Sequence, residues 1–190
     1  MKPVRPMIGS GLRTLAAAIA LACMMAIPAS AQDGAGQEGS ADQPDLRVGT
    51  SGLPVPRFVS LGAQEVNMRS GPGTRYPIKW VYTRKGLPMR VEAEFDIWRK
   101  VRDRDGEVGW VHGSLLSGRR NVIIVGEGPE GTQTLFDKPH PAAEPVLRAE
   151  DGVIGELLEC SQGWCRIRIN GKRGWVPELG LWGVQPSDRK

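Results

Sequence analysis

The chain has 190 residues, of which 25 are basic and 21 acidic, giving a formal net charge of +4. Three of the basic residues and none of the acidic residues lie in the first 31 positions, so the remaining chain carries 22 basic and 21 acidic residues. A nearly neutral chain lacks the positive field that is typical of proteins that bind nucleic acid or anionic membranes. We therefore predict neither of these partners.

The N-terminus has the layout of a secretory signal peptide. Its three basic residues come first, an apolar stretch follows at residues 15–27, and Ala29-Ser30-Ala31 supplies the small residues that a signal peptidase requires. We predict a signal peptide over residues 1–31, cleaved between Ala31 and Gln32. The alternative is an uncleaved anchor, but the apolar stretch is short for a bilayer. The mature protein is then periplasmic or secreted, with no integral membrane segment.

The segment after the signal peptide is compositionally biased. Residues 32–57 are rich in Gly, Ala, Asp, Gln, Ser and Pro and contain few large apolar side chains. Such a segment buries too little surface to offset the entropy of ordering, and we predict a disordered linker. Folded regions are expected at residues 58–120 and 121–184, followed by a tail at residues 185–190.

The folded regions have the pattern of an all-β protein. Apolar and polar residues alternate from Met89 to Phe95, which predicts a half-buried strand. Asp105-Gly106 and Asn170-Gly171 each lie between two short apolar segments. Both dipeptides accept the backbone conformations of tight hairpin turns, so we predict two β-hairpins.

These hairpins belong to an internal repeat. The first copy contains Trp98–Arg102 followed by Gly109-Trp110-Val111, and the second contains Trp164–Arg168 followed by Gly174-Trp175-Val176. Each copy has about 60 residues, which is enough for a small barrel. Short strands at this spacing favour closed or nearly closed β-barrels.

The first copy resembles a known family. Val66-Asn67-Met68-Arg69-Ser70-Gly71-Pro72-Gly73 is similar to the opening strand and loop of bacterial SH3 domains, and Trp98–Val101 with Gly109-Trp110-Val111 is similar to their later hairpin. The resemblance implies two tandem SH3-like, partly open β-barrels in an exported proteobacterial protein. It also implies binding to peptidoglycan or to an envelope protein. Leu135–Pro139 replaces the loop motif in the second copy, so we expect ligand binding mainly in the first.

Two cysteines remain after the signal peptide, which contains Cys23. Cys160 and Cys165 lie five positions apart, and in an oxidising compartment such a pair is expected to form a disulfide. Two thiolates cannot complete a tetrahedral zinc site alone, so we predict no bound metal.

The sequence offers no evident catalytic group. Its only histidines are His112 and His140, and it has no G-x-S-x-G, H-E-x-x-H or Gly-rich phosphate-binding motif. A cysteine–histidine peptidase needs a free thiol, whereas both cysteines are explained by the disulfide. We predict no catalytic residue, no cofactor and no enzymatic activity. A cell-wall hydrolase, or an accessory to one, is the least favoured function.

Strand alternation suggests one set of binding residues. Trp98, Lys100 and Arg102 fall on the face opposite the apolar core residues, and Trp164 does the same in the second copy. An aromatic ring beside cations suits a peptide that carries a carboxylate. A β-bulge that turns each Trp inward, or packing between the repeats, is the equally weighted alternative.

A second set of candidates lies near the first loop. Arg69 is placed to reach a ligand from this loop, and a solvated charge is the favoured alternative. Tyr76, Trp80 and Tyr82 are candidates to line a groove between loops, and core or edge positions are the equally weighted alternative. For Trp110 and Trp175 we expect core packing. The leading hypothesis is a binding protein for peptidoglycan peptide or an envelope protein, and the alternative is a periplasmic scaffold that adds a partner strand to a sheet edge.

Overall fold

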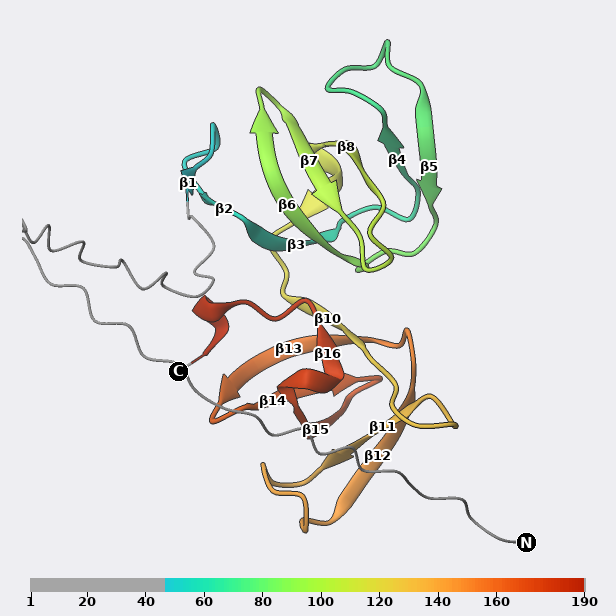
Figure 1. Ribbon diagram of the computed structural model, residues 1–190, viewed down its shortest axis with the longest axis vertical. Coiled ribbons are helices and arrows are strands. Elements are labelled where there is room, and N and C mark those ends of the chain that lie inside the picture. The colour runs from blue at the N-terminus through green and yellow to red at the C-terminus, as the bar shows by residue number, and fades with distance from the viewer. Residues whose placement is uncertain (1–46, 190) are drawn as a thin grey trace, which may run out of the picture. The chain divides into compact units, whose positions relative to one another are not determined.

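The alternating sequence pattern forms two seven-stranded antiparallel sheets in the computed structural model, which describes residues 47–189 (Figure 1). The all-β prediction with two tandem SH3-like domains is therefore confirmed. The first sheet has the strand order β5-β4-β8-β7-β6-β3-β9. Its strands are β3 (Arg57–Leu61), β4 (Val66–Arg69), β5 (Ile78–Tyr82), β6 (Pro88–Phe95), β7 (Trp98–Arg102), β8 (Val108–His112) and β9 (Leu116–Ser117).

The second sheet repeats this topology. Its order is β12-β11-β15-β14-β13-β10-β16, so each strand has a counterpart in the first sheet. The strands are β10 (Asn121–Ile124), β11 (Thr132–Phe136), β12 (Pro145–Glu150), β13 (Ile154–Ser161), β14 (Trp164–Ile169), β15 (Lys172–Pro177) and β16 (Leu181–Trp182). Short 3-10 helices precede the last strand of each sheet and end the chain: η1 (Gly113–Leu115), η2 (Glu178–Gly180) and η3 (Pro186–Asp188).

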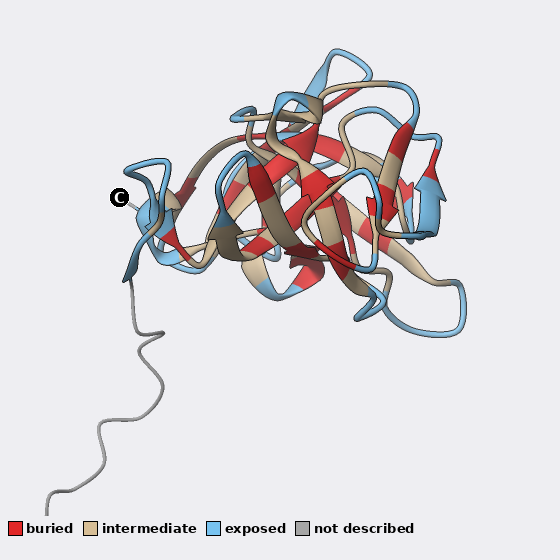
Figure 2. Cartoon of the chain, turned by 90° about the horizontal axis from the view of Figure 1, so that it is seen from above, coloured by how far each residue is buried: buried red, intermediate tan, exposed pale blue. Residues whose placement is uncertain are grey.

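Each sheet curves around its own apolar core, which appears in red in Figure 2. The first core includes Met68, Met89 and Val101, and the second includes Leu135 and Ile167, all fully buried. The intervening residues of each strand are partly exposed, which is the alternation expected of a half-buried sheet.

The two predicted hairpins are confirmed. Asp105-Gly106 lies in the turn between β7 and β8, where Gly106 has a φ of 90°. Asn170 and Gly171 form a two-residue turn between β14 and β15, with φ of 48° and 82°. Both residues of this turn lie in the left-handed region, as a turn of this type requires.

The prediction of disorder up to residue 57 is wrong for its last part. Residues 47–55 form an arm in which β1 (Arg47–Val48) pairs with β2 (Pro54–Val55). The arm is fixed to the first sheet because Val55 is buried in its core and Ser51 binds Glu94. The predicted signal peptide and residues 32–46 of the predicted linker lie outside the described residues. Among residues 47–189, none lies in a helix long and apolar enough to span a bilayer.

The predicted disulfide joins Cys160 of β13 to Cys165 of β14. These residues face each other in the strand register, where Glu94 and Arg99 face each other in the first repeat. Glu94 and Arg99 form an ion pair there, with 3.1 Å between Oε1 and Nε. One cross-strand position is therefore bridged covalently in one repeat and ionically in the other.

Candidate functional site

The loop after β4 is organised by the motif that suggested the family resemblance. The Arg69 guanidinium donates hydrogen bonds from Nη1 to the carbonyl oxygens of Thr74 (3.1 Å) and Tyr76 (2.8 Å). The Tyr76 ring lies against Gly71, where a β-carbon would come within 2.5 Å of it. Arg69 and Tyr76 therefore shape this loop.

Gly109 brings β4 close to β8. A β-carbon at this position would lie 2.5 Å from Met68 Cγ and 2.8 Å from the carbonyl oxygen of Arg69, so only glycine permits this approach. The strand register then sets Arg69 directly opposite Trp110.

One row of side chains crosses four strands of the first sheet. Ile78 of β5 pairs with Arg69 of β4, Arg69 pairs with Trp110 of β8, and Trp110 pairs with Lys100 of β7. Residues that face each other directly in a sheet share a face. We call these four residues the Trp110 row. In the strand register, Trp110 lies between two cationic residues, Arg69 and Lys100.

The charges of the Trp110 row are not neutralised by acidic partners. Among the described residues, the Lys100 side chain makes no hydrogen bond or ion pair, and the Arg69 guanidinium donates only to neutral carbonyl groups. Trp110 is half-buried and outside the apolar core. This arrangement offers a carboxylate two cations and offers a flat or apolar group an indole face.

The second repeat has a different row at the same place. Pro145, Phe136, Trp175 and Arg166 replace the four residues of the first repeat in the register. Arg166 is paired with Glu159, with 3.4 Å between Nη1 and Oε1. The second row therefore keeps the tryptophan but has no unpaired cation.

Trp98 lies on the predicted strand face but is not exposed. It belongs to the face opposite Val101 and is absent from the apolar core, yet only 8% of its surface is accessible. Its ring makes an edge-to-face contact with His112, with 5.3 Å between centroids. Trp98 is therefore covered rather than accessible, because it pairs with the His112 ring of the facing strand, and this agrees with the alternative of a Trp that is not exposed.

Tyr82 is also buried, which agrees with the alternative of a core position rather than a position in a groove. Its hydroxyl donates a 2.7 Å hydrogen bond to Asp103 Oδ2. Asp103 is itself buried and accepts a hydrogen bond from the backbone N–H of Glu107 through Oδ1, which holds the β7–β8 turn. Burial, followed by the bond to Asp103, raises the pKa of Tyr82 above its usual range.

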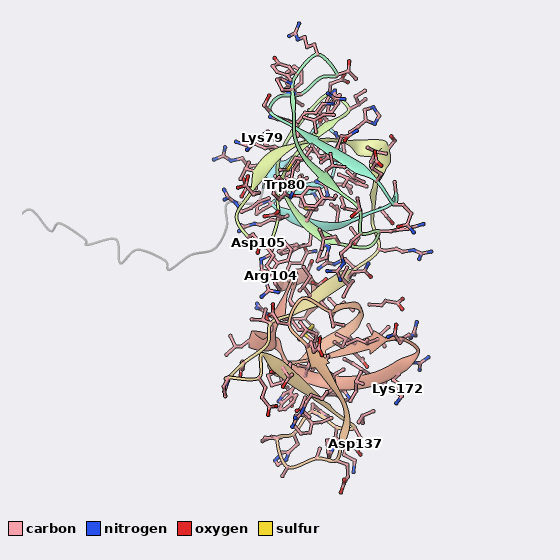
Figure 3. The ribbon with its side chains drawn as sticks, turned by 90° about the vertical axis from the view of Figure 1, so that its right-hand side faces the viewer. Lys79, Trp80, Arg104, Asp105, Asp137 and Lys172 are labelled. Carbon is pink, nitrogen blue, oxygen red and sulfur yellow. A yellow bond between two sulfur atoms is a disulfide. The ribbon has the colours of Figure 1, made fainter. Side chains whose placement is uncertain are left out.

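The other candidates are distributed over the surface. Arg102 forms an ion pair with Glu92, with 2.5 Å between Nε and Oε1. Trp164 is half-buried and makes an edge-to-face contact with Phe136, with 6.0 Å between centroids. Trp80 is 52% exposed on the edge strand β5, next to Lys79 (Figure 3). The register thus joins Arg69 and Lys100 in one row but leaves the other candidates outside it.

Trp110 was not among the predicted candidates, because we expected it in the core. The alternation Gly109, Trp110, Val111 carries the needed information, because Gly109 and Val111 are both buried. We expected burial because the side chain is large, but strand alternation places Trp110 on the face opposite the core. Within the part of the chain that the structure describes, no cluster of three or more His, Cys, Asp or Glu side chains could hold a metal ion.

Comparison with known proteins agrees with this two-repeat organisation. The sequence matches the bacterial SH3 domain family over residues 62–118 and 130–183. A relative in Bacillus subtilis (strain 168), named as the N-acetylmuramoyl-L-alanine amidase YrvJ, is 26% identical over 123 residues. The match covers 61% of this chain but only 24% of YrvJ.

Solved structures with similar segments include NlpC2 and NlpC1 from Trichomonas vaginalis, each with 15% identity and a TM-score of 0.30. The matches cover 67% and 72% of this chain and 48% of each of those chains. The family match spans both sheets and includes more than half of the sequence. The chain therefore belongs to the bacterial SH3 domain family and contains two copies of the domain.

Proposed function

We propose that this protein is a non-catalytic cell-envelope binding protein that recognises peptidoglycan peptide through the Trp110 row of its first repeat. The observation that carries the proposal is the row itself, in which Trp110 lies between Arg69 and the unpaired Lys100. A stem peptide offers carboxylates to the cations and apolar side chains to the indole. Membership of the bacterial SH3 domain family supports an envelope ligand.

The absence of enzymatic activity is part of the proposal. The family match covers only the SH3 domains, and the two cysteines that follow the predicted signal peptide are joined in the disulfide. The chain spans about a quarter of YrvJ, so the activity in that name belongs to YrvJ alone. The proposed site in the envelope also rests on the signal peptide predicted over residues 1–31.

Co-sedimentation with purified sacculi tests the proposed binding. The wild-type protein should pellet with the sacculi, and Trp110→Ala should lower its affinity by at least about tenfold, as expected for a central aromatic contact. The matched variant Trp175→Ala in the second repeat should bind within about twofold of wild type. A wild-type protein that remains in the supernatant at all sacculus concentrations contradicts the proposal.

A scaffold function is the second candidate, and the edge strand β5 favours it. Ile78, Trp80 and Val81 are about half exposed along this unpaired edge. Exposed edges of this kind accept an added strand from a partner. In-cell crosslinking from position 81 should then recover one defined protein, whereas crosslinking to glycan-linked peptides alone would contradict the scaffold.

A further inference from the structure

The second repeat binds the end of its own chain. After β16, the chain continues through η3, and the Asp188 carboxylate receives two hydrogen bonds from Arg120. The distances are 3.1 Å from Nε to Oδ1 and 2.6 Å from Nη2 to Oδ2. Arg189 also forms a parallel bridge with Cys160 of β13. The second repeat therefore holds residues 186–189, a 3-10 turn followed by Arg189, through one backbone bridge and a two-point guanidinium–carboxylate contact.

Arg57 is the counterpart of Arg120 in the first repeat. In the first repeat, Arg57 pairs with Val91. Leu157 occupies the position of Val91 in the second repeat, and its backbone N–H donates a hydrogen bond to the Arg120 carbonyl oxygen. By the same register, Gly118 corresponds to Gly183, whose carbonyl oxygen accepts a 2.7 Å hydrogen bond from Arg120 Nη2. The surroundings of the two arginines can thus be compared position by position.

The first repeat has a pocket of about 390 Å³ beside Arg57. Its volume lies in the range of small ligand sites. The walls combine cationic, apolar and backbone groups, including Arg57, Arg99, Leu53, Phe58, Leu116 and Gly118. Phe58 and Leu116 belong to β3 and β9, and Leu53 comes from the arm at residues 47–55.

This pocket has an excess of positive charge. The Arg57 and Arg99 side chains are only 11% and 15% exposed, and both bind one fully buried carboxylate, that of Glu94. In the second repeat, the counterparts of Glu94 and Arg99 are the disulfide cysteines, and Arg120 forms an ion pair with Asp188. The pocket of the first repeat therefore has two cationic side chains for one carboxylate, whereas Arg120 and Asp188 in the second repeat balance each other in charge.

Each of the two arginines has one buried donor without a hydrogen-bond partner among the described residues 47–189, Nε–H in Arg57 and Nη1–H in Arg120. In Arg57, Nη1 donates to Pro54 and Nη2 to Glu94. The corresponding Nε of Arg120 is the one that donates to Asp188. A buried donor without a partner is costly, so a carboxylate at this point would be strongly favoured.

We propose that the pocket beside Arg57 binds a short acidic protein segment, with an Asp or Glu carboxylate at Arg57 Nε in the way that Asp188 binds Arg120. A protein segment is the favoured occupant because the second repeat holds one beside Arg120, with its backbone paired to β13. The pocket shares no residue with the Trp110 row. The inference therefore goes beyond the proposed recognition of peptidoglycan.

A synthetic peptide with the sequence of residues 183–189, Gly-Val-Gln-Pro-Ser-Asp-Arg, is the probe. Isothermal titration into the full chain should give saturable binding at one site. The D188N version of the peptide should bind at least about tenfold more weakly, because it loses a charge-assisted two-point contact. Absence of binding, or equal affinity for the two peptides, would overturn the proposal.

Two variants of the protein locate the site. Arg57→Lys keeps the charge beside Glu94 but removes the Nε donor. Ser117→Trp places a bulky ring in the pocket, whose walls include Ser117. Each should weaken peptide binding at least about tenfold while circular dichroism stays unchanged. If Arg57→Lys does not fold, Ser117→Trp decides the question.

The Lys100→Ala variant separates the two proposals. It removes a cation of the Trp110 row and should leave the affinity for the acidic peptide within about twofold of wild type. Displacement of the peptide by soluble muropeptides would contradict the assignment of this pocket to a protein segment. Failure of sacculus binding with intact peptide binding would instead reject only the peptidoglycan proposal.

Discussion

Glu94 is a buried carboxylate that joins three segments of the first repeat. It accepts hydrogen bonds from the Ser51 backbone (2.7 Å) and from Arg57 (2.6 Å), and it pairs with Arg99. Burial acts to raise the pKa of Glu94, but the hydrogen bonds from Ser51 and Arg57 outweigh it and lower the pKa to about 2. The carboxylate therefore stabilises the fold in its charged form.

We predict that Glu94→Gln destabilises the protein by about 3 kcal/mol at neutral pH, because Arg57 and Arg99 lose their shared anion. The effect has a defined pH dependence. A lowered pKa contributes stability above the unfolded value of about 4.5, and this contribution is lost as the pH falls toward 2. Urea denaturation at several pH values should show the wild-type and variant curves converging in that window. A constant difference between them would contradict this account.

Tyr82 and Asp103 form the second buried polar contact of the first repeat. We predict that Tyr82→Phe costs about 1–3 kcal/mol, because Asp103 Oδ2 loses its donor while it stays buried. Since the pKa of Tyr82 is raised, the wild-type protein should also lose stability above pH of about 10, where the unfolded chain ionises first. Chemical denaturation at neutral and alkaline pH measures both effects. The variant should lack the alkaline component.

At the scale of strands and turns, local sequence determines much of the fold. Alternation predicts β6, and Asp105-Gly106 and Asn170-Gly171 predict the two hairpins, because these features act over a few residues. The arm at residues 47–55 was not predicted. Its order depends on Glu94, which lies 43 positions from Ser51. The contacts that order the arm therefore cannot be recognised from its composition.

Strand phase predicts faces better than it predicts exposure. It correctly separates Trp98 and Lys100 from the core residue Val101, but the contact of Trp98 with His112 depends on pairing with another strand. The same phase identifies Trp110 as outward-facing, against an expectation based on its size. Register, which becomes known only with the fold, then unites Arg69, Trp110 and Lys100.

The disulfide gives a prediction for the β13–β14 hairpin. We predict that the double variant Cys160→Ser, Cys165→Ser loses about 2 kcal/mol, because the bond closes a short loop. The loss should lower the midpoint of thermal unfolding, whereas the matched position in the first repeat keeps its Glu94–Arg99 pair. Wild-type protein with reductant is the control. Equal melting curves for the oxidised and variant proteins would contradict this role.

At the scale of the whole molecule, the two repeats share contacts that link their folding. Phe58 of β3 makes an edge-to-face contact with Trp182 of β16, with 5.1 Å between centroids. The Phe58 backbone N–H donates to Gln185 Oε1 at 2.8 Å, and Arg104 forms an ion pair with Asp151. Aromatic contacts of this kind contribute about 0.5–1.5 kcal/mol beyond their buried area.

We predict that Phe58→Ala weakens this link more than it weakens either core. The free energy of unfolding should fall by about 1–3 kcal/mol, and one cooperative transition should separate into two. Arg104→Ala is a useful comparison, because its partly exposed ion pair should contribute less than about 1 kcal/mol. Calorimetry resolves the number of transitions. A single transition of unchanged midpoint in Phe58→Ala would contradict the coupling.

The most direct test of the proposed function is a titration of the ¹⁵N-labelled protein with soluble muropeptides, followed by two-dimensional NMR. We predict saturable shifts at the Trp110 indole N–H and at the backbone amides of Lys100 and Arg69, with small changes at Trp175. The shifts should weaken with added salt, because two cations take part. Absence of shifts at saturating muropeptide, or shifts confined to the second repeat, would contradict recognition of peptidoglycan by the Trp110 row.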